Sequence, residues 1–289
     1  MHPTLARLLT GTPIITDGAW GTQLQALGLT PGDCPDHWNL THPDEVRKVA
    51  QRYVDAGSQV ILTNTFGANR IMLAGHNLAD KVKEINAAGV RISKEAAGAR
   101  AMVFASIGPS GKMIMSGDVT EEELAVAFTE QATALAVAGA DALVVETMAD
   151  VVEARIAVSA AHATGLPVVA SMVFDSGKDK DRTMMGTTPE TVATELTAAG
   201  ADVIGANCGL GIEGYIPIAR RLRAATSLPV WIKANAGLPE MKDGKITYRT
   251  TPDEFASLAK QLGEAGVAFV GGCCGTSPDF VAALTRTLR

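Results

Sequence analysis

The chain has 289 residues, of which 47% are hydrophobic and only 4% aromatic, and its formal net charge is −6. The acidic balance argues against a nucleic-acid partner, and no apolar run approaches the ~20 residues that cross a bilayer. The N-terminus lacks the basic start and apolar centre of a signal peptide, and the four cysteines lack the spacing of a secreted disulfide framework. We therefore expect a cytoplasmic protein without a membrane or nucleic-acid partner.

Eight short apolar runs along the chain predict eight strands. In chain order they lie at 13–17, 60–61, 101–106, 142–145, 167–169, 203–204, 229–231 and 267–270. An Ala-Gly pair precedes four of them, with the glycines at Gly57, Gly139, Gly200 and Gly266. Such a glycine is typical of the left-handed residue that ends a helix directly before a buried strand. Two other runs begin with a Leu-Pro pair, and proline is tolerated at the first residue of a strand.

Helical stretches separate the predicted strands, for example at 121–138 and 189–199. Thr120 followed by Glu123 is typical of a capping box at a helix start. Short, nearly continuous apolar strands alternating with helices predict a parallel sheet covered on both faces. Eight repeats favour a single (β/α)8 TIM barrel over residues 1–289. A doubly wound open sheet is the structural alternative, but no Gly-x-Gly-x-x-Gly pattern follows the first strand.

Three of the four cysteines follow predicted strands. Cys208 comes after the sixth, and the adjacent pair Cys273 and Cys274 comes after the eighth, within Gly-Gly-Cys-Cys-Gly-Thr. The active sites of such barrels lie at the carboxyl ends of the strands, so the three thiols should meet. Three thiolates suit zinc, which takes tetrahedral sulfur ligands and keeps a fourth position open for substrate in catalytic sites. The sequence thus predicts a catalytic zinc centre that holds a substrate thiol as its thiolate.

Two other readings of the cysteines exist. Cysteine is often only a small buried hydrophobe, and this is our interpretation of Cys34. A redox role for the adjacent pair would need a strained vicinal disulfide and lacks the Cys-x-x-Cys spacing.

Further polar residues follow other predicted strands. Asp17 either caps the next helix or binds a ligand, and the segment from Gly18 to Thr22 offers glycine amides suited to a carboxylate. Glu146 ends an apolar run, where a carboxylate must be paired or belong to a site, and it suits an ammonium group. Asn64 and Asn207 either bind substrate or tie loops together.

Together these segments resemble the homocysteine S-methyltransferase family. The resemblance rests on Asp-Gly-Ala-Trp-Gly-Thr at 17–22, Thr-Asn-Thr-Phe at 63–66, Glu-Thr at 146–147 and the two cysteine motifs. Within the family the chain most resembles the homocysteine-binding module of cobalamin-dependent methionine synthase. The resemblance implies a barrel with one zinc on Cys208, Cys273 and Cys274. It also implies substrate amino and carboxylate contacts near Asp17, Gly18 and Glu146, so that homocysteine is converted to methionine.

The methyl donor is less well defined. Because the chain ends soon after its cysteine pair, we expect cobalamin to be supplied in trans, as a methylcorrinoid on a separate protein or as free methylcobalamin. The open face of the barrel would then be a docking surface for the corrinoid protein. A small donor such as S-methylmethionine or betaine is the alternative.

The acceptor and the direction of transfer are also open. The barrel could act on another thiol, or demethylate a donor, within a corrinoid system. A subunit that only binds a thiol or a corrinoid protein, without catalysis, is the non-enzymatic alternative.

Overall fold

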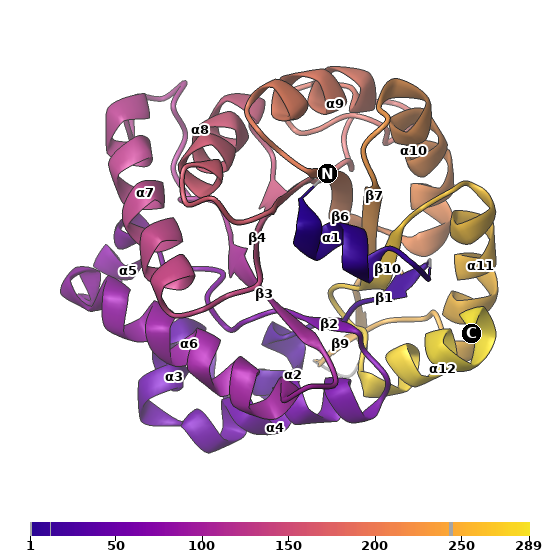
Figure 1. Cartoon of the computed structure of the whole chain (residues 1–289), viewed down its shortest axis with the longest axis horizontal. Coiled ribbons are helices and arrows are strands. Elements are labelled where there is room, and N and C mark those ends of the chain that lie inside the picture. The colour runs from indigo at the N-terminus through magenta and orange to yellow at the C-terminus, as the bar shows by residue number, and fades with distance from the viewer. Residues whose placement is uncertain (1, 12, 243–244) are drawn as a thin grey trace.

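The protein, described here by a computed structural model covering residues 2–11, 13–242 and 245–289, is built around eight parallel strands (Figure 1). They form one sheet in the order β1-β10-β7-β6-β5-β4-β3-β2. A parallel bridge between Thr16 and Val60 joins the first and last strands of that order. The sheet therefore closes on itself with the helices outside it, and the predicted (β/α)8 barrel is confirmed.

All eight predicted strands occur. They are β1 (Ile14–Ile15), β2 (Val60–Ile61), β3 (Met102–Ile107), β4 (Ala142–Met148), β5 (Val168–Met172), β6 (Val203–Gly211), β7 (Val230–Asn235) and β10 (Phe269–Gly272). A separate antiparallel hairpin, β8 (Glu240–Lys242) with β9 (Lys245–Thr247), follows β7. This hairpin was not predicted from the sequence.

The helices fill the intervals between the strands. They are α1 (Pro3–Leu8), α2 (Gly21–Ala26), α3 (Trp38–Thr41), α4 (Pro43–Asp55), α5 (Arg70–Ala74), α6 (Val82–Ala97), α7 (Glu121–Val137), α8 (Val151–His162), α9 (Pro189–Ala198), α10 (Ile212–Ala225), α11 (Pro252–Glu264) and α12 (Pro278–Leu288), with 3-10 turns η1 (Pro35–His37) and η2 (Ala79–Lys81). Among the described residues, no helix combines the length and the apolarity needed to cross a membrane.

The local signals in the sequence act as expected. The four glycines of the Ala-Gly pairs have φ between 77° and 105°, the left-handed region that lets the chain turn from helix to strand. Thr120 and Glu123 form the predicted capping box at the start of α7. Helices α7 and α9 each end one residue before the predicted boundary, because the last predicted residue is the C-cap.

The interior of the barrel changes character along its axis. A cluster of buried apolar residues fills the end where the strands begin, and it includes Phe104, Trp231 and Phe269. The centroids of the Trp231 and Phe269 rings lie 5.2 Å apart. Leu5 of α1 belongs to the same cluster, and α1 lies across this end of the barrel in Figure 1. The apolar filling closes the N-terminal end, so a ligand site must lie at the opposite end.

We predict that Gly205→Ala in β6 destabilises the protein. A Cβ at Gly205 would lie 2.4 Å from the backbone oxygen of Trp231 and 2.8 Å from its Cβ. Neither atom can move far inside the barrel, and overpacking of this kind costs about 1–3 kcal/mol. Urea unfolding should show the loss. Gly263→Ala is the matched control: a Cβ at Gly263, within helix α11, meets nothing within 4 Å, so this variant should be as stable as the wild type or more so.

Candidate zinc and thiol-binding site

The three predicted cysteine ligands lie together at the carboxyl end of the barrel. Their sulfur atoms all lie within 4.8 Å of one another, and the Sγ atoms of Cys208 and Cys274 are 3.9 Å apart. All three side chains are partly buried. The fourth cysteine, Cys34, lies apart from this group in the segment before η1.

Strand β7 brings the cysteines together because it lies between β6 and β10. Ala234 of β7 pairs with Cys208 on one side and with Gly272 on the other. The Ala234 carbonyl also accepts a hydrogen bond from the Cys273 amide at 2.7 Å. The Ala236 amide donates to the Cys274 carbonyl at 2.9 Å, which fixes the turn that follows β10. Residues 65 positions apart in the chain thus become neighbours by strand pairing alone.

Backbone geometry adapts the strand ends to the cluster. Cys208 has φ 64°, a left-handed conformation that is unusual for any residue other than glycine, and the β6–β7 register shifts between Cys208 and Gly211. Such strain is commonly retained at functional sites because the surrounding structure enforces it. Gly275 has φ 79°, and a Cβ there would lie 2.3 Å from the ring of Tyr248. Glycine is therefore required after the cysteine pair both for conformation and for close packing.

The donor set fits zinc. A tetrahedral ion with Zn–S bonds of ~2.3 Å needs sulfur atoms about 3.8 Å apart, close to the spacing of Cys208 and Cys274. An oxygen donor is also at hand, because Asn235 Oδ1 is buried and has no hydrogen-bond partner among the described residues. The Asn235 side chain lies within hydrogen-bonding reach of Cys208.

Without a metal, the three sulfurs share protons unequally. Hydrogen bonds from Cys273 and Cys274 lower the pKa of Cys208 to about 3. The hydrogen bond to Cys208 raises the pKa of Cys274 to about 11, and the same interaction raises that of Cys273. A divalent cation bound to all three sulfurs would favour the thiolate form of Cys273 and Cys274 as well.

Asn207 links the thiols to the neighbouring strands. Its Nδ2 donates to Thr147 Oγ1 at 2.7 Å and lies 4.0 Å from the Sγ atom of Cys273. Its Oδ1 accepts from Ser171 Oγ at 2.7 Å and from the Thr147 amide at 2.9 Å. Thr147 itself has φ 61°, so a second strained residue lies at this rim. Asn207 is fully buried and braces β4, β5 and β6 against one another.

Glu146 lies beside this network. It is 6% exposed, its Oε1 accepts from Ser106 Oγ at 2.5 Å, and its Oε2 lies 3.5 Å from the Nδ2 atom of Asn207. Burial raises the pKa of the Glu146 carboxyl, while the nearby charge of Lys233 and the hydrogen bond from Ser106 offset part of this effect. Asn207 thus lies between Glu146 and Cys273, and the ammonium-binding role of Glu146 stays a prediction.

Asp17 has a full set of partners and no solvent exposure. Its Oδ2 accepts from Trp20 Nε1 and from the Leu62 amide, each at 2.7 Å, and its Oδ1 is paired with the ammonium group of Lys233. Lys233 of β7 is itself 2% exposed. The structure therefore holds Asp17 within a buried ion pair under the site.

The other predicted contact residues are arranged differently. Gly18 packs against Thr276, because a Cβ on Gly18 would lie 2.7 Å from Thr276 Oγ1. Thr22 lies on α2, and its Oγ1 is buried without a hydrogen-bond partner among the described residues. Asn64 donates to Pro35 O at 2.7 Å and to Asn39 Oδ1 at 3.1 Å, contacts that tie its loop to the segment before α4.

Three residues near the thiols were missed as site residues in the sequence. Lys233 could have been found by the argument applied to Glu146, since it is a lone charge within the apolar run Val230–Ala234. Asn235 follows the seventh predicted strand, so the strand-end argument applied to Asn207 could have found it. Tyr248, whose ring covers Gly275, carries no signal, because its position depends on the unpredicted β8–β9 hairpin.

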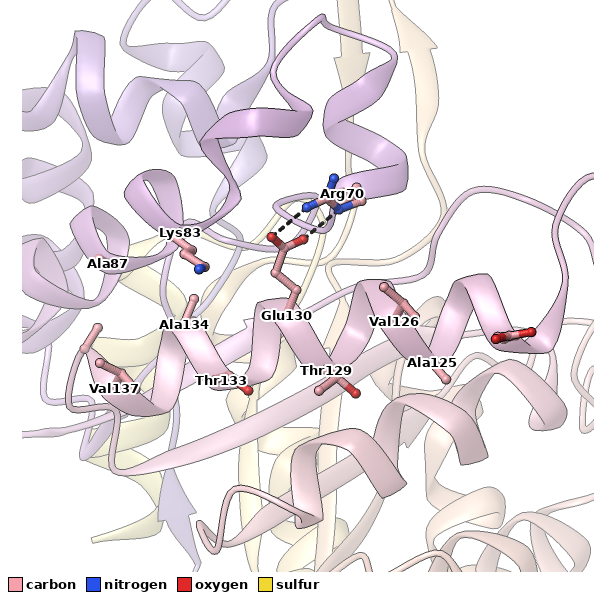
Figure 2. A pocket seen from close by; sticks show the side chains of 12 residues that line it. Arg70, Lys83, Ala87, Ala125, Val126, Thr129, Glu130, Thr133, Ala134 and Val137 are labelled. Carbon is pink, nitrogen blue, oxygen red and sulfur yellow. Dashed lines mark hydrogen bonds and ion pairs between the residues drawn. The ribbon is translucent and has the colours of Figure 1, made fainter.

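A large surface groove lies elsewhere. Its volume is about 1030 Å³, and its lining side chains come from α5, α6 and α7 on the outside of the barrel. Figure 2 shows Arg70 and Glu130 paired among its lining residues, and both nitrogen–oxygen distances of the pair are 2.8 Å. Val126 and Val137 of α7 are exposed within it. None of the residues that line it lies at a strand end, so the groove is separate from the thiol site.

Comparison with known proteins identifies the family. Residues 14–288 match the sequence model described as homocysteine S-methyltransferase. The chain belongs to the homocysteine S-methyltransferase family. The family resemblance inferred from the sequence is confirmed, and with it the placement of the chain in a family of methyltransferases.

Two curated relatives are both named methionine synthase. The one from Mycobacterium tuberculosis is 31% identical over 296 residues, covering 96% of this chain and 25% of the relative. The one from Mycobacterium leprae is 31% identical over 287 residues, covering 93% of this chain and 24% of the relative. The chain thus spans about a quarter of the length of these relatives.

A solved structure shares the fold over its whole length. The homocysteine methyltransferase MmuM from Escherichia coli, in its metallated form, superposes with a TM-score of 0.82 at 24% identity. The match covers 99% of this chain and 100% of that one. The apo form of the same protein gives a TM-score of 0.76.

We predict that the purified protein binds one zinc ion per chain through the three-cysteine cluster. Cys208→Ser should remove most of the bound metal, because a neutral hydroxyl is a far poorer zinc ligand than a thiolate. Cys34→Ser, which alters a cysteine outside the cluster, is the matched control and should keep full zinc content. Elemental analysis after dialysis measures both. Equal zinc in the two variants would contradict the assigned ligand set.

Proposed function

We propose that the protein transfers a methyl group to the thiol of homocysteine to give methionine. The observation that carries this proposal is the cluster of three cysteine sulfurs at the carboxyl ends of β6 and β10, in a chain of the homocysteine S-methyltransferase family. Zinc held by Cys208, Cys273 and Cys274 would supply Lewis acidity that keeps a substrate thiol in its nucleophilic thiolate form at neutral pH.

The chain's own residues then bind and orient the amino acid. Glu146, buried beside the cluster, is suited to the substrate ammonium group. The segment from Gly18 to Thr22 is suited to the carboxylate, with the unpartnered Oγ1 of Thr22 as one available donor. Asn207 is fully buried. Its Nδ2 atom lies 3.5 Å from Glu146 Oε2 and would help to hold the Glu146 carboxylate in place. Fixing both ends of the substrate would direct its sulfur along the line of attack.

The reaction balances without a general base in the transfer step. The sulfur lone pair forms the new S–C bond, and the electron pair of the donor–methyl bond leaves with the donor. The proton of the substrate thiol is lost when the thiolate binds, before the methyl group moves.

A methylcorrinoid is our proposed donor, either on a separate protein or as free methylcobalamin. Its support is the 31% identity to proteins named methionine synthase, together with the resemblance of the motifs to a cobalamin-dependent member of the family. The barrel's open face, where the thiols lie, would receive the corrinoid.

A small sulfonium or quaternary ammonium donor, such as S-methylmethionine or betaine, is the second candidate. Its support is that the attack of a thiolate on a methyl group is the same displacement whether the leaving group is a corrinoid, a sulfide or an amine.

A donor panel separates these candidates. Zinc-loaded protein and homocysteine are incubated with methylcobalamin, S-methylmethionine or betaine, and methionine is measured by mass spectrometry. We expect methionine with methylcobalamin and at most slow formation with the other two. Turnover with a small donor alone would replace the corrinoid proposal, and tight homocysteine binding without turnover on any donor would favour a binding subunit.

We predict that Glu146→Gln weakens homocysteine use by about 10–100-fold in kcat/KM, mainly through KM, because the ammonium loses its charged partner. Since burial raises the pKa of Glu146, the carboxylate is lost as the pH falls through that raised value. The KM of the wild type for homocysteine should therefore rise toward acidic pH. The KM of the Glu146→Gln variant should not show this rise, because glutamine does not titrate. If the KM for homocysteine changed with pH in the same way in both proteins, Glu146 would not be a contact of the substrate ammonium group.

A further inference from the structure

Helix α7 is unusually apolar for a helix on the outside of the barrel. After Glu123 its only charged residue is Glu130, whereas the neighbouring helix α6 has five charged residues. Two valines lie on its solvent side, where Val126 is 59% exposed and Val137 is 84% exposed. The inner side of α7 packs on the barrel through Leu124 and other buried residues. A helix that is apolar on both sides is typical of one that is covered on both sides.

The groove described above runs along this outer side of α7, with α6 beside it (Figure 2). Arg70 pairs with Glu130 through two hydrogen bonds, so the charge of Glu130 is compensated within the chain. The remaining side chains that α7 contributes beyond its first turn are small or apolar: Ala125, Val126, Thr129, Thr133, Ala134 and Val137. An exposed apolar groove rimmed by polar residues is typical of an interaction site.

Two further charges lie toward opposite ends of the groove. Glu122 is in the first turn of α7, and Figure 2 shows Lys83 of α6 at the level of Ala134, in the second half of α7. Together with Arg70 and Glu130 they bring the groove to a net charge of zero, although the whole chain carries −6. Two copies of an acidic chain repel each other least where the surfaces that meet are neutral.

The arrangement of these charges is complementary to itself. In a dimer with twofold symmetry the same patch of both copies meets, and two identical helices then pack antiparallel. An axis near Thr129, the middle residue of α7, brings the first turn of each helix to the second half of the other. Glu122 of each copy then approaches Lys83 of the other copy at both ends of the contact. The exposed valines of both copies are covered in between.

We propose that the outer face of α7 and the groove beside it form the contact of a symmetric homodimer. The occupant of the groove is a second copy of this chain, and the contact pairs Glu122 with Lys83 twice. One helix pair ~25 Å long buries less than the ~800 Å² per partner of a standard interface, so we expect dissociation in the micromolar range. The groove is separate from the thiol site, so the inference does not depend on the proposed function.

Sedimentation equilibrium of the full chain across the micromolar range measures the dissociation constant of the dimer. Thr129→Lys places two like charges close to the axis and should weaken the dimer by at least about tenfold. Thr197→Lys is the matched control. It makes the same change at an exposed residue of helix α9, outside the groove, and should keep the wild-type constant.

A charge exchange tests the antiparallel arrangement itself. Lys83→Glu and Glu122→Lys each bring like charges together at both ends of the contact, and each variant alone should dimerise about tenfold more weakly than the wild type. An equimolar mixture of the two variants restores opposite charges at both ends. The mixture should therefore dimerise about as well as the wild type, a recovery that misfolding of either variant could not produce.

The outcomes decide between a second copy and other occupants. Dimers that Thr129→Lys weakens, and that the mixture of exchanged charges recovers, support the proposal. A wild type that stays monomeric across the micromolar range overturns it and leaves the groove to a different partner. Dimers that Thr129→Lys does not weaken would be joined through another face. A mixture that is no tighter than its components would exclude the twofold pairing of Glu122 with Lys83, and either result overturns the proposal.

Discussion

The pairing of β7 with β6 on one side and β10 on the other is the constraint on which the site depends. Ala234 aligns with both Cys208 and Gly272, and its carbonyl fixes the Cys273 amide. Closure of the barrel therefore creates the thiol cluster, and no flexible loop is needed to bring the sulfurs together. A cluster built on strand ends in this way is preorganised, as the proposed zinc site requires.

The same strand sets the electrostatics beneath the thiols. Lys233, one residue before Ala234, is buried and paired with Asp17, and the charge of Glu146 also helps to raise its pKa. The buried Lys233 charge is compensated by its ion pair with Asp17, which accepts two further hydrogen bonds, and Glu146 accepts a hydrogen bond from Ser106. The thiol cluster thus rests on a polar layer whose net charge is set by three side chains. The apolar filling around Trp231 isolates that layer from the other end of the barrel.

Much of this could be predicted from sequence, because the relevant signals are local. Glycines such as Gly57 and Gly200 mark the turns from helix to strand, and the eight-fold repeat of those signals implies the barrel. Cysteines placed directly after strands then have to converge at one end. The convergence of Cys208, Cys273 and Cys274 and the place of Glu146 within a strand of the barrel were reached by this reasoning, and the family was reached through the motif resemblance.

The remaining features depend on contacts between distant strands, which local patterns do not report. The pairing of Asp17 with Lys233 joins residues 216 positions apart, and no pattern near Asp17 in the sequence indicates that Lys233 is its partner. Asn64 is tied into a loop by Pro35 and Asn39, so the alternative that it binds substrate could not be weighed without the structure. Tyr248 owes its place over Gly275 to a hairpin that no repeat or composition signal indicated.

We propose that the three cysteines hold zinc and leave a coordination position for a substrate sulfur. X-ray absorption at the zinc edge, on the purified protein with and without homocysteine, tests it most directly. We expect about three sulfur neighbours at ~2.3 Å in the protein alone and about four once homocysteine is added. A sulfur count that does not change with homocysteine, or a zinc ion surrounded only by nitrogen and oxygen, would contradict it.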